Sequence, residues 1–239
     1  MNVIVTGASR GIGREIALKF AKSTTRVKKL FLLSRNISKL EEIKSEILMD
    51  NLPVDIVIIP FDFNSGIENY KPLNAQISCN HIDVLINNAG YLVNKPFNQL
   101  NTEDVAGMVQ VNFTGVIGVL QELMGKFGGS TPTHIINIGS MGGYQGSPKF
   151  PGLSVYSATK AAIACLTECL ATEHAGKNIF HNCLALGAVQ TEMLNEAFPG
   201  YKAPVSPAEM AEYIVDFAFK GHTIFNGKVL PLSLIDPVR

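Results

Sequence analysis

Residues 2–13 read NVIVTGASRGIG, an apolar run that leads directly into a glycine-rich turn. We predict that the run forms a strand and that a helix follows, ending at about residue 22. A turn of this kind exposes backbone N–H groups and the positive end of the helix dipole, which together favour pyrophosphate binding. The spacing of Gly7, Gly11 and Gly13 differs from the common Gly-x-Gly-x-x-Gly pattern. Glycine can serve a turn for backbone reasons alone, but this place at the start of the chain favours a nucleotide site.

Apolar strand-like runs and helical stretches alternate along the rest of the chain. Continuous apolar runs are typical of strands that are buried on both faces of a parallel sheet. We therefore predict an α/β fold with one doubly wound, mainly parallel seven-stranded sheet and helices on both faces, in a single domain over residues 1–239. The remaining strands are expected at residues 30–34, 55–61, 83–87, 134–138, 180–186 and 228–232, and the remaining helices at 38–49, 68–79, 101–128, 154–175 and from 206 onward.

Local signals mark the helix ends and one crowded helix. Capping boxes are expected at residues 38–41 and 206–209, where a serine stands three residues before a glutamate. Gly107, Gly115 and Gly118 interrupt the long helix of residues 101–128. Glycine weakens a helix by about 1 kcal/mol relative to alanine, so we expect these positions to pack closely against a neighbour.

The bulk composition limits the kinds of partner. The chain has 239 residues, of which 46% are hydrophobic and 17% charged, and basic and acidic residues number 20 each. This balance indicates neither a nucleic acid nor an anionic membrane as partner. No apolar run approaches the roughly 18 residues that span a bilayer, and the N-terminus reads as a strand rather than a signal peptide. A cytoplasmic protein is the simplest interpretation.

The cysteines and histidines do not suggest a metal centre. Cys79, Cys165, Cys169 and Cys183 lack a Cys-x-x-Cys pair and have no histidine at ligand spacing, so we expect buried thiols. His174, near the end of a predicted helix, is expected to make a favourable contact with the helix dipole.

The residues after the second strand indicate which nucleotide binds. A cofactor without a 2′-phosphate favours an acidic residue about 20 residues past the glycine turn. Here Ser34 is followed by Arg35, and Arg10 projects from the turn itself. Two guanidinium groups could hold a 2′-phosphate, although either could be a solvated surface side chain. We expect NADP(H) to be preferred, with NAD(H) as the alternative.

Tyr156 and Lys160 lie four residues apart and therefore on one face of a helix. A phenol with a pKa of about 10 is a poor base at neutral pH, and a nearby ammonium lowers that pKa. Ser140 ends a predicted strand, where open α/β sheets bind ligands, and could hydrogen-bond a substrate oxygen. Taken alone, the pair could be structural and Ser140 a turn residue. Combined with a dinucleotide turn, they predict transfer of a hydride and a proton at a carbon–oxygen bond.

These motifs together resemble the short-chain dehydrogenase/reductase family, in its classical branch, over almost the whole chain. Residues 6–13 look like the family's cofactor turn, and Asp62 matches the acidic residue that contacts adenine. Asn-Asn-Ala-Gly at residues 87–90 matches the motif after the fourth strand. The resemblance implies a Rossmann domain and a catalytic tetrad of Asn112, Ser140, Tyr156 and Lys160.

The resemblance also implies a role for each member of the tetrad. Tyr156 would donate or accept the proton, and Lys160 would lower the pKa of the phenol and bind the nicotinamide ribose. Ser140 would orient and polarise the carbonyl. Asn112 would hold a water that links Lys160 to solvent. The implied cofactor contacts, besides Tyr156 and Lys160, are Gly7, Ser9, Arg10, Gly11, Ile12, Gly13, Ser34, Arg35, Asp62, Phe63, Asn88, Ala89, Gly90, Gly187, Val189 and Thr191.

The chain departs from the family pattern in three places, one of which is a slightly longer segment between Ser140 and Tyr156. Leu186 stands where the family commonly has a proline before glycine, which concerns the rigidity of that loop rather than the chemistry. The sequence after Gly227 lacks the acidic Gly-Gly ending of many members. Residues 192–205 lie where the family places a mobile lid, and the apolar side chains there fit either a lid over a moderately apolar substrate or a short surface helix: Met193, Leu194, Phe198 and Tyr201.

The expected partner is a small-molecule carbonyl or alcohol. The family usually forms a homodimer or homotetramer through the helix after Asn101 and the helix that carries Tyr156. One alternative function is a catalytically weak dinucleotide sensor or scaffold. The complete tetrad favours an enzyme, because a sensor does not need all four residues. Within the enzymes, a 3-oxoacyl thioester reductase is the alternative.

Overall fold

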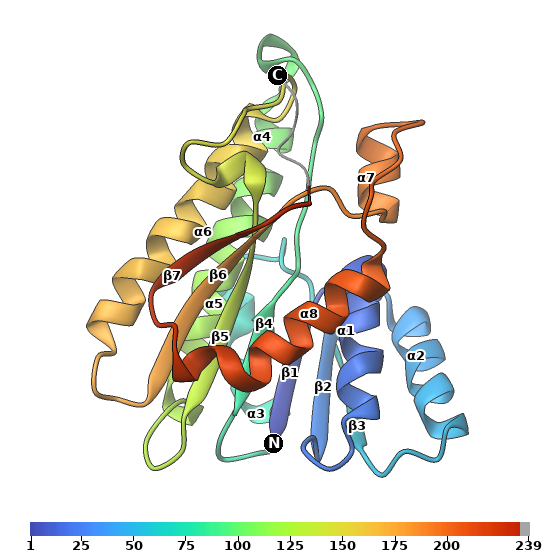
Figure 1. Ribbon diagram of the computed structural model, residues 1–239, viewed down its shortest axis with the longest axis vertical. Coiled ribbons are helices and arrows are strands. Elements are labelled where there is room, and N and C mark those ends of the chain that lie inside the picture. Colours follow the sequence, from blue (N-terminus) through green and yellow to red (C-terminus); the bar gives the residue numbers. More distant parts are fainter. Residues whose placement is uncertain (235–239) are drawn as a thin grey trace.

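The computed structural model describes residues 1–234 and contains a parallel seven-stranded sheet with helices on both faces (Figure 1). The strands lie in the order β3-β2-β1-β4-β5-β6-β7, and every neighbouring pair is parallel. The predicted α/β class is therefore confirmed. Residues 235–239 of the expected domain lie outside the described residues. The strands are β1 (Asn2–Thr6), β2 (Lys29–Ser34), β3 (Asp55–Pro60), β4 (Val84–Asn87), β5 (Thr133–Ser140), β6 (Ile179–Leu186) and β7 (Lys228–Leu232).

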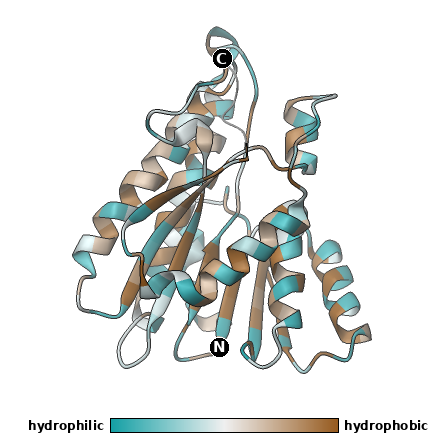
Figure 2. Cartoon of the chain, viewed as in Figure 1, coloured by the Kyte–Doolittle hydropathy of each residue, from teal (hydrophilic) through white to brown (hydrophobic). Residues whose placement is uncertain are grey.

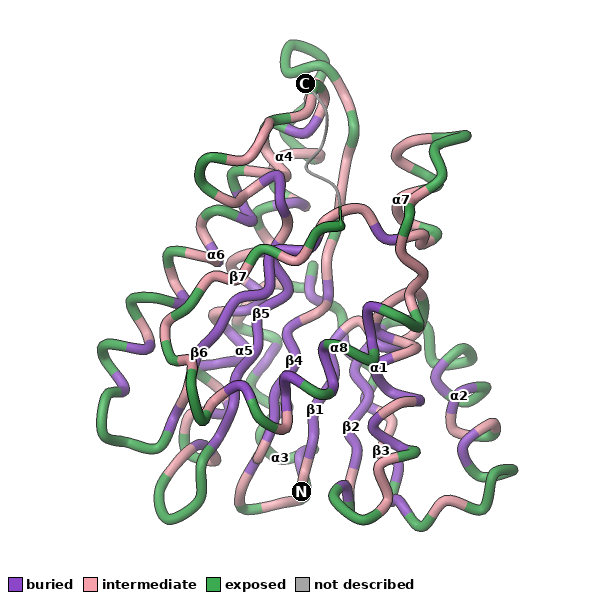
Figure 3. Tube along the Cα trace, in the orientation of Figure 1, coloured by how far each residue is buried: buried purple, intermediate pink, exposed green. Residues whose placement is uncertain are grey.

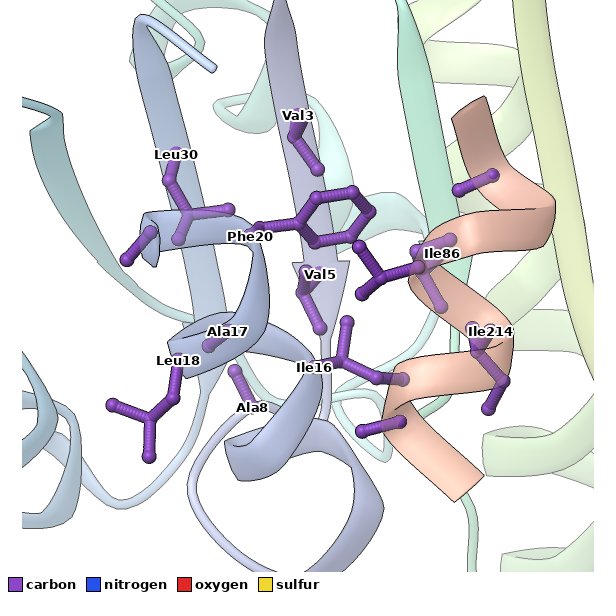
Figure 4. Packing of buried hydrophobic residues seen from close by; sticks show 14 of the residues in the cluster. Val3, Val5, Ala8, Ile16, Ala17, Leu18, Phe20, Leu30, Ile86 and Ile214 are labelled. Carbon is purple, nitrogen blue, oxygen red and sulfur yellow. The ribbon is translucent and has the colours of Figure 1, made fainter. Parts of the chain in front are cut away.

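Strand β1 shows how one apolar run serves two cores. Successive side chains of a strand point to opposite faces of the sheet. Val3 and Val5 belong to a core with Ile16 and Phe20 of α1 (Gly11–Lys22) and with the helix α8 (Pro207–Lys220) (Figure 4). Ile4, between them, belongs to the core on the other face. Strands β1 and β4, at the centre of the sheet, are accordingly buried and largely apolar (Figures 2 and 3).

The helices form two layers with one short helix outside them. Helices α1, α2 (Ile37–Met49) and α8 cover one face of the sheet. The other face is covered by α3 (Leu73–Gln76), α5 (Gly115–Leu123) and α6 (Ser154–Glu173), and α4 (Thr102–Val109) packs against α6. Helix α7 (Glu192–Ala197) stands beyond the carboxyl ends of the strands, apart from both layers (Figure 1).

The strand order indicates a crevice at the carboxyl ends of the central strands. Strand β1 pairs with β2 on one side and with β4 on the other, so the chain reverses its direction of winding there. Ligands of open α/β sheets bind at such a switch point, outside the carboxyl ends of the strands. Thr6, Asn87, Ser140 and Leu186 are the last residues of β1, β4, β5 and β6, and so meet at this edge.

One of the two expected capping boxes is wrong. Helix α2 is capped by Asn36, whose side chain accepts a hydrogen bond from Lys39 N at 3.1 Å. The Ser38 hydroxyl donates to Asn36 Oδ1 and caps nothing itself. Asparagine and serine are equally good N-caps, so local sequence alone does not choose between neighbours. The second box is confirmed, with Ser206 and Glu209 at the start of α8.

The helix expected at residues 68–79 is also wrong. A 3₁₀-helix spans Ile67–Tyr70, and only Leu73–Gln76 is α-helical. Pro72 separates them, since proline has no N–H group to continue the hydrogen bonds of a helix. The long helix of residues 101–128 begins as expected with Asn101 as its cap, but a π-helical turn at Gln110–Thr114 divides it into α4 and α5.

The glycines of α5 pack closely, as predicted. A Cβ added at Gly118 would lie 2.6 Å from Cδ2 of Tyr70, and one at Gly115 would lie 3.0 Å from the Tyr70 hydroxyl. Tyr70 is fully buried and donates a hydrogen bond to the carbonyl of Phe63 at 2.7 Å. The glycines therefore leave space for the ring of Tyr70, whose position is fixed by burial and by the hydrogen bond of its hydroxyl.

We predict that Gly118→Ala destabilises the protein by about 1–3 kcal/mol, because overpacking against a fixed ring outweighs the helix propensity gained. Urea unfolding monitored by circular dichroism measures the effect. Gly125→Ala is the matched control, since a Cβ there has no atom within 4 Å. Equal stability of Gly118→Ala and the wild type would contradict the packing argument.

Expectations about cysteines and one histidine also need correction. Cys165 and Cys169 are exposed on the outer face of α6, Cys79 is half-buried, and Cys183 alone is buried. His174 forms a hydrogen bond with His181 at 2.9 Å, and burial lowers the pKa of His174, which disfavours the charged form that a helix dipole would stabilise. Among residues 1–234, no helix is long and apolar enough to cross a membrane, and no cluster of metal ligands occurs.

Candidate active site

The turn after β1 has the shape of an anion cradle. Gly7 and Gly11 have φ angles of +64° and +55°, values that residues with a side chain rarely adopt. A Cβ at Gly13 would lie 2.2 Å from the carbonyl oxygen of Gly7, so the turn closes tightly on the helix. Arg10, the N-cap of α1, makes no capping hydrogen bond with its side chain, and the first turn of the helix contains no acidic residue. The first N–H groups of α1 are thus left for a ligand, as a pyrophosphate requires.

Strands β1 and β4 are locked together beneath the cradle. Thr6 Oγ1 accepts hydrogen bonds from the backbone N–H groups of Asn88 and Ala89, both at 3.0 Å. The Asn88 side chain donates to the carbonyls of Thr6 and Gly7 at 3.0 and 3.2 Å. The glycine turn is therefore fixed by the Asn-Asn-Ala-Gly segment. The role of Thr6 is not predictable from the sequence, because a threonine at a strand end gives no local sign of its partner.

A cleft of about 1040 Å³ opens above this edge of the sheet. Every candidate site residue except Asn112 lies on its wall. The glycine turn, the ends of β2 and β3 and the segment after β4 form one part of the wall. Ser140, Tyr156 and Lys160, with Gly187, Val189 and Thr191, form another. Segments more than a hundred residues apart in sequence thus share one cavity.

The part of the cleft next to β2 carries the two arginines. Ser34 donates a hydrogen bond to the Ser9 hydroxyl at 2.8 Å, which ties β2 to the glycine turn. Arg35 lies 3.9 Å from a carboxylate oxygen of Asp62. Arg10 forms an ion pair at 2.5 Å with Glu196 of α7, a partner that the sequence analysis did not foresee.

Ser140, Tyr156 and Lys160 meet where β5 and α6 face the cleft. The Ser140 hydroxyl accepts a hydrogen bond from Gly142 N at 3.1 Å and hydrogen-bonds the Tyr156 hydroxyl. Lys160 Nζ donates to the carbonyl of Ile138 at 2.8 Å and lies 5.8 Å from the centroid of the Tyr156 ring. The serine hydroxyl and the phenol therefore point at one place, with an ammonium beside them.

Both the sequence and the fold are similar to those of known proteins. The family model described as short chain dehydrogenase matches residues 1–202. The chain belongs to the short-chain dehydrogenase family. It is 35% identical over 196 residues to an uncharacterised oxidoreductase of Staphylococcus saprophyticus, covering 80% of this chain and 75% of that protein.

Solved structures of the family resemble the whole fold. A short-chain dehydrogenase of Shigella flexneri complexed with NADP has a TM-score of 0.84 and 26% identity, covering 96% of this chain and 95% of that one. ElxO with NADP bound has a TM-score of 0.82 and 26% identity, covering 97% and 96%. Both likenesses cover nearly the whole chain.

The two ionisable groups of this short-chain dehydrogenase differ from the sequence expectation. Burial raises the pKa of Tyr156 to about 12, and the Ser140 hydrogen bond opposes that rise. Burial lowers the pKa of Lys160 to about 8. The expected net lowering of the phenol pKa by the ammonium is therefore not found, because desolvation is the larger effect and Lys160 Nζ bonds the Ile138 carbonyl.

Asn112 is buried and lies behind the wall of the cleft. It sits in the π-helical turn, a feature that is frequent at functional sites. Its side chain accepts from Tyr91 N at 2.7 Å and donates to Tyr91 O at 2.8 Å and to Thr159 at 3.1 Å. These bonds fix the segment after β4 against α6, at the residue that precedes Lys160.

The departure at Leu186 has a structural explanation. Leu186 is buried and continues β6, where it pairs with Ser140 of β5 on one side and with Leu232 of β7 on the other. The following Gly187 donates its N–H to Leu232 O at 2.8 Å. Strand pairing on both sides therefore holds this loop where the family commonly has a proline.

Apolar side chains line the outer part of the cleft. Helix α7 begins at its cap Thr191, whose side chain accepts a hydrogen bond from Leu194 N. The segment after it is braced by Gln190, which bonds both Asn195 and Ala203. The apolar and aromatic residues that face the cleft from this segment and from opposite it are Met193, Leu194, Phe198, Tyr201, Tyr91, Leu92, Phe150 and Leu153.

Proposed function

We propose that this short-chain dehydrogenase is an NADP(H)-dependent carbonyl reductase that transfers hydride reversibly between the cofactor and an apolar ketone or aldehyde. The observation that carries the proposal is the position of Ser140, Tyr156 and Lys160 on the wall of the same cleft as the glycine cradle. Hydride transfer requires the donor and the proton source to face one carbon–oxygen bond, and a shared cavity is what permits this.

The residues on the wall fit the cofactor. The cradle and the uncapped start of α1 would hold the pyrophosphate, and Asp62 and Phe63 would flank the adenine. Arg10 and Arg35 would hold a 2′-phosphate, which the NADP bound in the Shigella flexneri structure and in ElxO supports. The cofactor, when bound, supplies the hydride, and the remaining chemistry belongs to the protein.

Tyr156 is the proposed proton donor. With a pKa of about 12 the phenol is fully protonated at neutral pH, and a forming alkoxide is a stronger base than a phenolate. Proton transfer to the substrate oxygen is therefore favourable in the direction of carbonyl reduction. Ser140 would hydrogen-bond the same oxygen. Lys160 is mainly charged below pH 8 and would stabilise the phenolate that forms.

The lid and the oligomeric state are further proposals. We propose that residues 192–205 act as a lid, since Met193 and Leu194 of α7 line the cleft. We propose a homodimer or homotetramer through α4, α5 and α6. The outer face of α6 presents the small exposed residues Ala158 and Ala161, which permit close approach of a second copy. Analytical ultracentrifugation would measure the oligomeric state.

The function is tested by following NADPH oxidation with a panel of aromatic aldehydes, medium-chain ketones and an acetoacetyl thioester. We expect turnover with apolar carbonyls. Preference for the acetoacetyl thioester would favour the 3-oxoacyl reductase instead. Tight NADPH binding without turnover of any panel member would support a dinucleotide sensor and contradict the reductase.

Arg35→Asp tests the cofactor preference. We predict that it weakens NADPH binding about ten- to hundredfold, because a charged hydrogen bond to the phosphate is lost and a repulsive carboxylate replaces it. NADH binding should stay the same or improve, since an acidic residue there suits a free 2′-hydroxyl. Titration calorimetry with both cofactors measures the change, with Lys39→Asp on the exposed side of α2 as control. Unchanged NADPH affinity would remove the assignment.

A further inference from the structure

The ion pair between Arg10 and Glu196 joins two parts of the cleft that are far apart in sequence. Both nitrogens of the guanidinium fork engage the carboxylate, Nη1 to Oε1 at 2.5 Å and Nη2 to Oε2 at 3.4 Å. Arg10 belongs to the cofactor cradle, and Glu196 lies in the last turn of α7. The hydrogen bond from Arg10 lowers the pKa of Glu196, so the pair is ionised at neutral pH.

Two further contacts hold α7 at the mouth of the cleft. The Asn94 side chain, from the segment after β4, donates a hydrogen bond to the carbonyl of Ala197 at 2.7 Å. On the other side, a Cβ at Gly11 would lie 3.3 Å from the methyl group of Thr191. Helix α7 thus touches the glycine turn at one end and the segment after β4 at the other. Arg10 provides the charged part of this attachment.

Glu196 already binds the guanidinium of Arg10, to which the 2′-phosphate is proposed to bind. Arg35, the second arginine, already faces Asp62 at 3.9 Å, and Asp62 is proposed to contact the adenine. Glu196 has no proposed role toward the cofactor. A phosphate monoester carries about 1.5 to 2 negative charges at neutral pH and is a bidentate partner for arginine, as a carboxylate is. A 2′-phosphate and Glu196 would therefore compete for one guanidinium.

We propose that Glu196 is an internal competitor of the cofactor's 2′-phosphate for Arg10, so that NADP(H) releases this attachment of α7 whereas NAD(H) leaves it in place. This inference rests on the proposed function, because it assumes that Arg10 binds the phosphate. It adds a specificity-determining residue outside the cradle. It also makes the position of the lid segment depend on which dinucleotide is bound.

The size of the effect follows from the exposure of the pair. The two side chains are 42% and 62% exposed, and exposed ion pairs are weak. We therefore expect Glu196→Gln to strengthen NADPH binding by about two- to fivefold and to leave NADH binding unchanged. The matched control is Glu212→Gln, which removes a carboxylate from an exposed pair with Lys19 at 2.9 Å between α1 and α8, away from the cleft.

Binding is measured by calorimetry with adenosine 2′,5′-bisphosphate and with AMP as probes, which differ only in the phosphate. In the wild type we expect the bisphosphate to bind more tightly, and in Glu196→Gln we expect that preference to grow. In Arg10→Ala, adding Glu196→Gln should have no further effect on the bisphosphate. An unchanged preference in Glu196→Gln would overturn the competition and leave the cofactor assignment intact. Equal binding of the two probes by the wild type would overturn both.

Hydrogen exchange of the amides of residues 192–198 gives a second readout that needs no turnover. We expect the bisphosphate to speed exchange there in the wild type and AMP not to do so. In Glu196→Gln the exchange should be fast without either probe. Identical exchange in the wild type with bisphosphate and with AMP would contradict the release of α7.

Discussion

Tyr156→Phe is expected to lower kcat for carbonyl reduction by about 10²- to 10⁴-fold, the usual contribution of a positioned general acid. The phenol hydroxyl, next to Ser140 on the cleft wall, is the proposed proton donor, and phenylalanine keeps the ring while removing the proton. NADPH affinity should change little, because the hydroxyl is lost from the substrate end of the cleft. Single-turnover oxidation of bound NADPH, compared with its dissociation constant, separates chemistry from binding.

Two variants make this result interpretable. Tyr213→Phe removes a hydroxyl from an exposed tyrosine on α8 and should keep full activity. Ser140→Ala should slow turnover less than Tyr156→Phe, because Ser140 is proposed to orient the carbonyl without supplying its proton. A fully active Tyr156→Phe enzyme would show that the proton comes from another group.

The second large effect concerns stability in acid. His134 and His181 are buried between the sheet and its neighbouring helices. His134 bonds the Ala218 carbonyl at 3.1 Å and Asn182 at 3.0 Å, and His181 bonds His174. Burial lowers the pKa of His134 to about 4 and that of His181 to about 3. Both are therefore neutral in the folded protein well below pH 6.

The direction of the pH effect follows from where protons bind. Below about pH 6.5 the unfolded chain protonates these histidines and the folded protein does not, so the unfolded state is favoured. The contribution of each neutral histidine to the free energy of unfolding is fully present above pH 6.5. It is lost as the pH falls toward 4 for His134 and toward 3 for His181. Each contributes about 1.4 kcal/mol per pH unit in that range, or about 3–4 kcal/mol in total between pH 7 and pH 5.

Urea unfolding at a series of pH values measures this loss. His181→Asn should reduce the slope of stability against pH by about half, even if the variant is less stable at pH 7. A free energy of unfolding that stays level between pH 7 and pH 5 would contradict neutral buried histidines.

The sequence predicted the strands well because their signal is local. Buried parallel strands require continuous apolar runs, and the expected and observed limits of β1 and β7 are identical. The errors lie where several local signals compete or where tertiary packing decides. Pro72 shortened a helix that the apolar pattern favoured, and the exposure of Cys165 and Cys169 depends on which face of α6 meets the sheet.

The candidate site was predictable in its members but less so in its electrostatics. The motifs predicted most residues that line the cleft, because the fold brings the glycine turn, the strand ends and one face of α6 to the same cavity. The pairing of Arg10 with Glu196 joins residues 186 apart, and nothing near either residue indicates it. The pKa of Tyr156 was expected to fall because an ammonium is near, but burial depends on the whole wall around it.

The central claim is that hydride and proton reach one carbon–oxygen bond inside this cleft. It is tested most directly by reducing a carbonyl that the enzyme accepts with NADPH deuterated at both C4 positions, and analysing the alcohol by mass spectrometry. We predict that the wild-type product carries deuterium on the former carbonyl carbon and that Tyr156→Phe forms almost none of it. Alcohol without deuterium, or equal deuterium transfer by Tyr156→Phe, would contradict the proposed site.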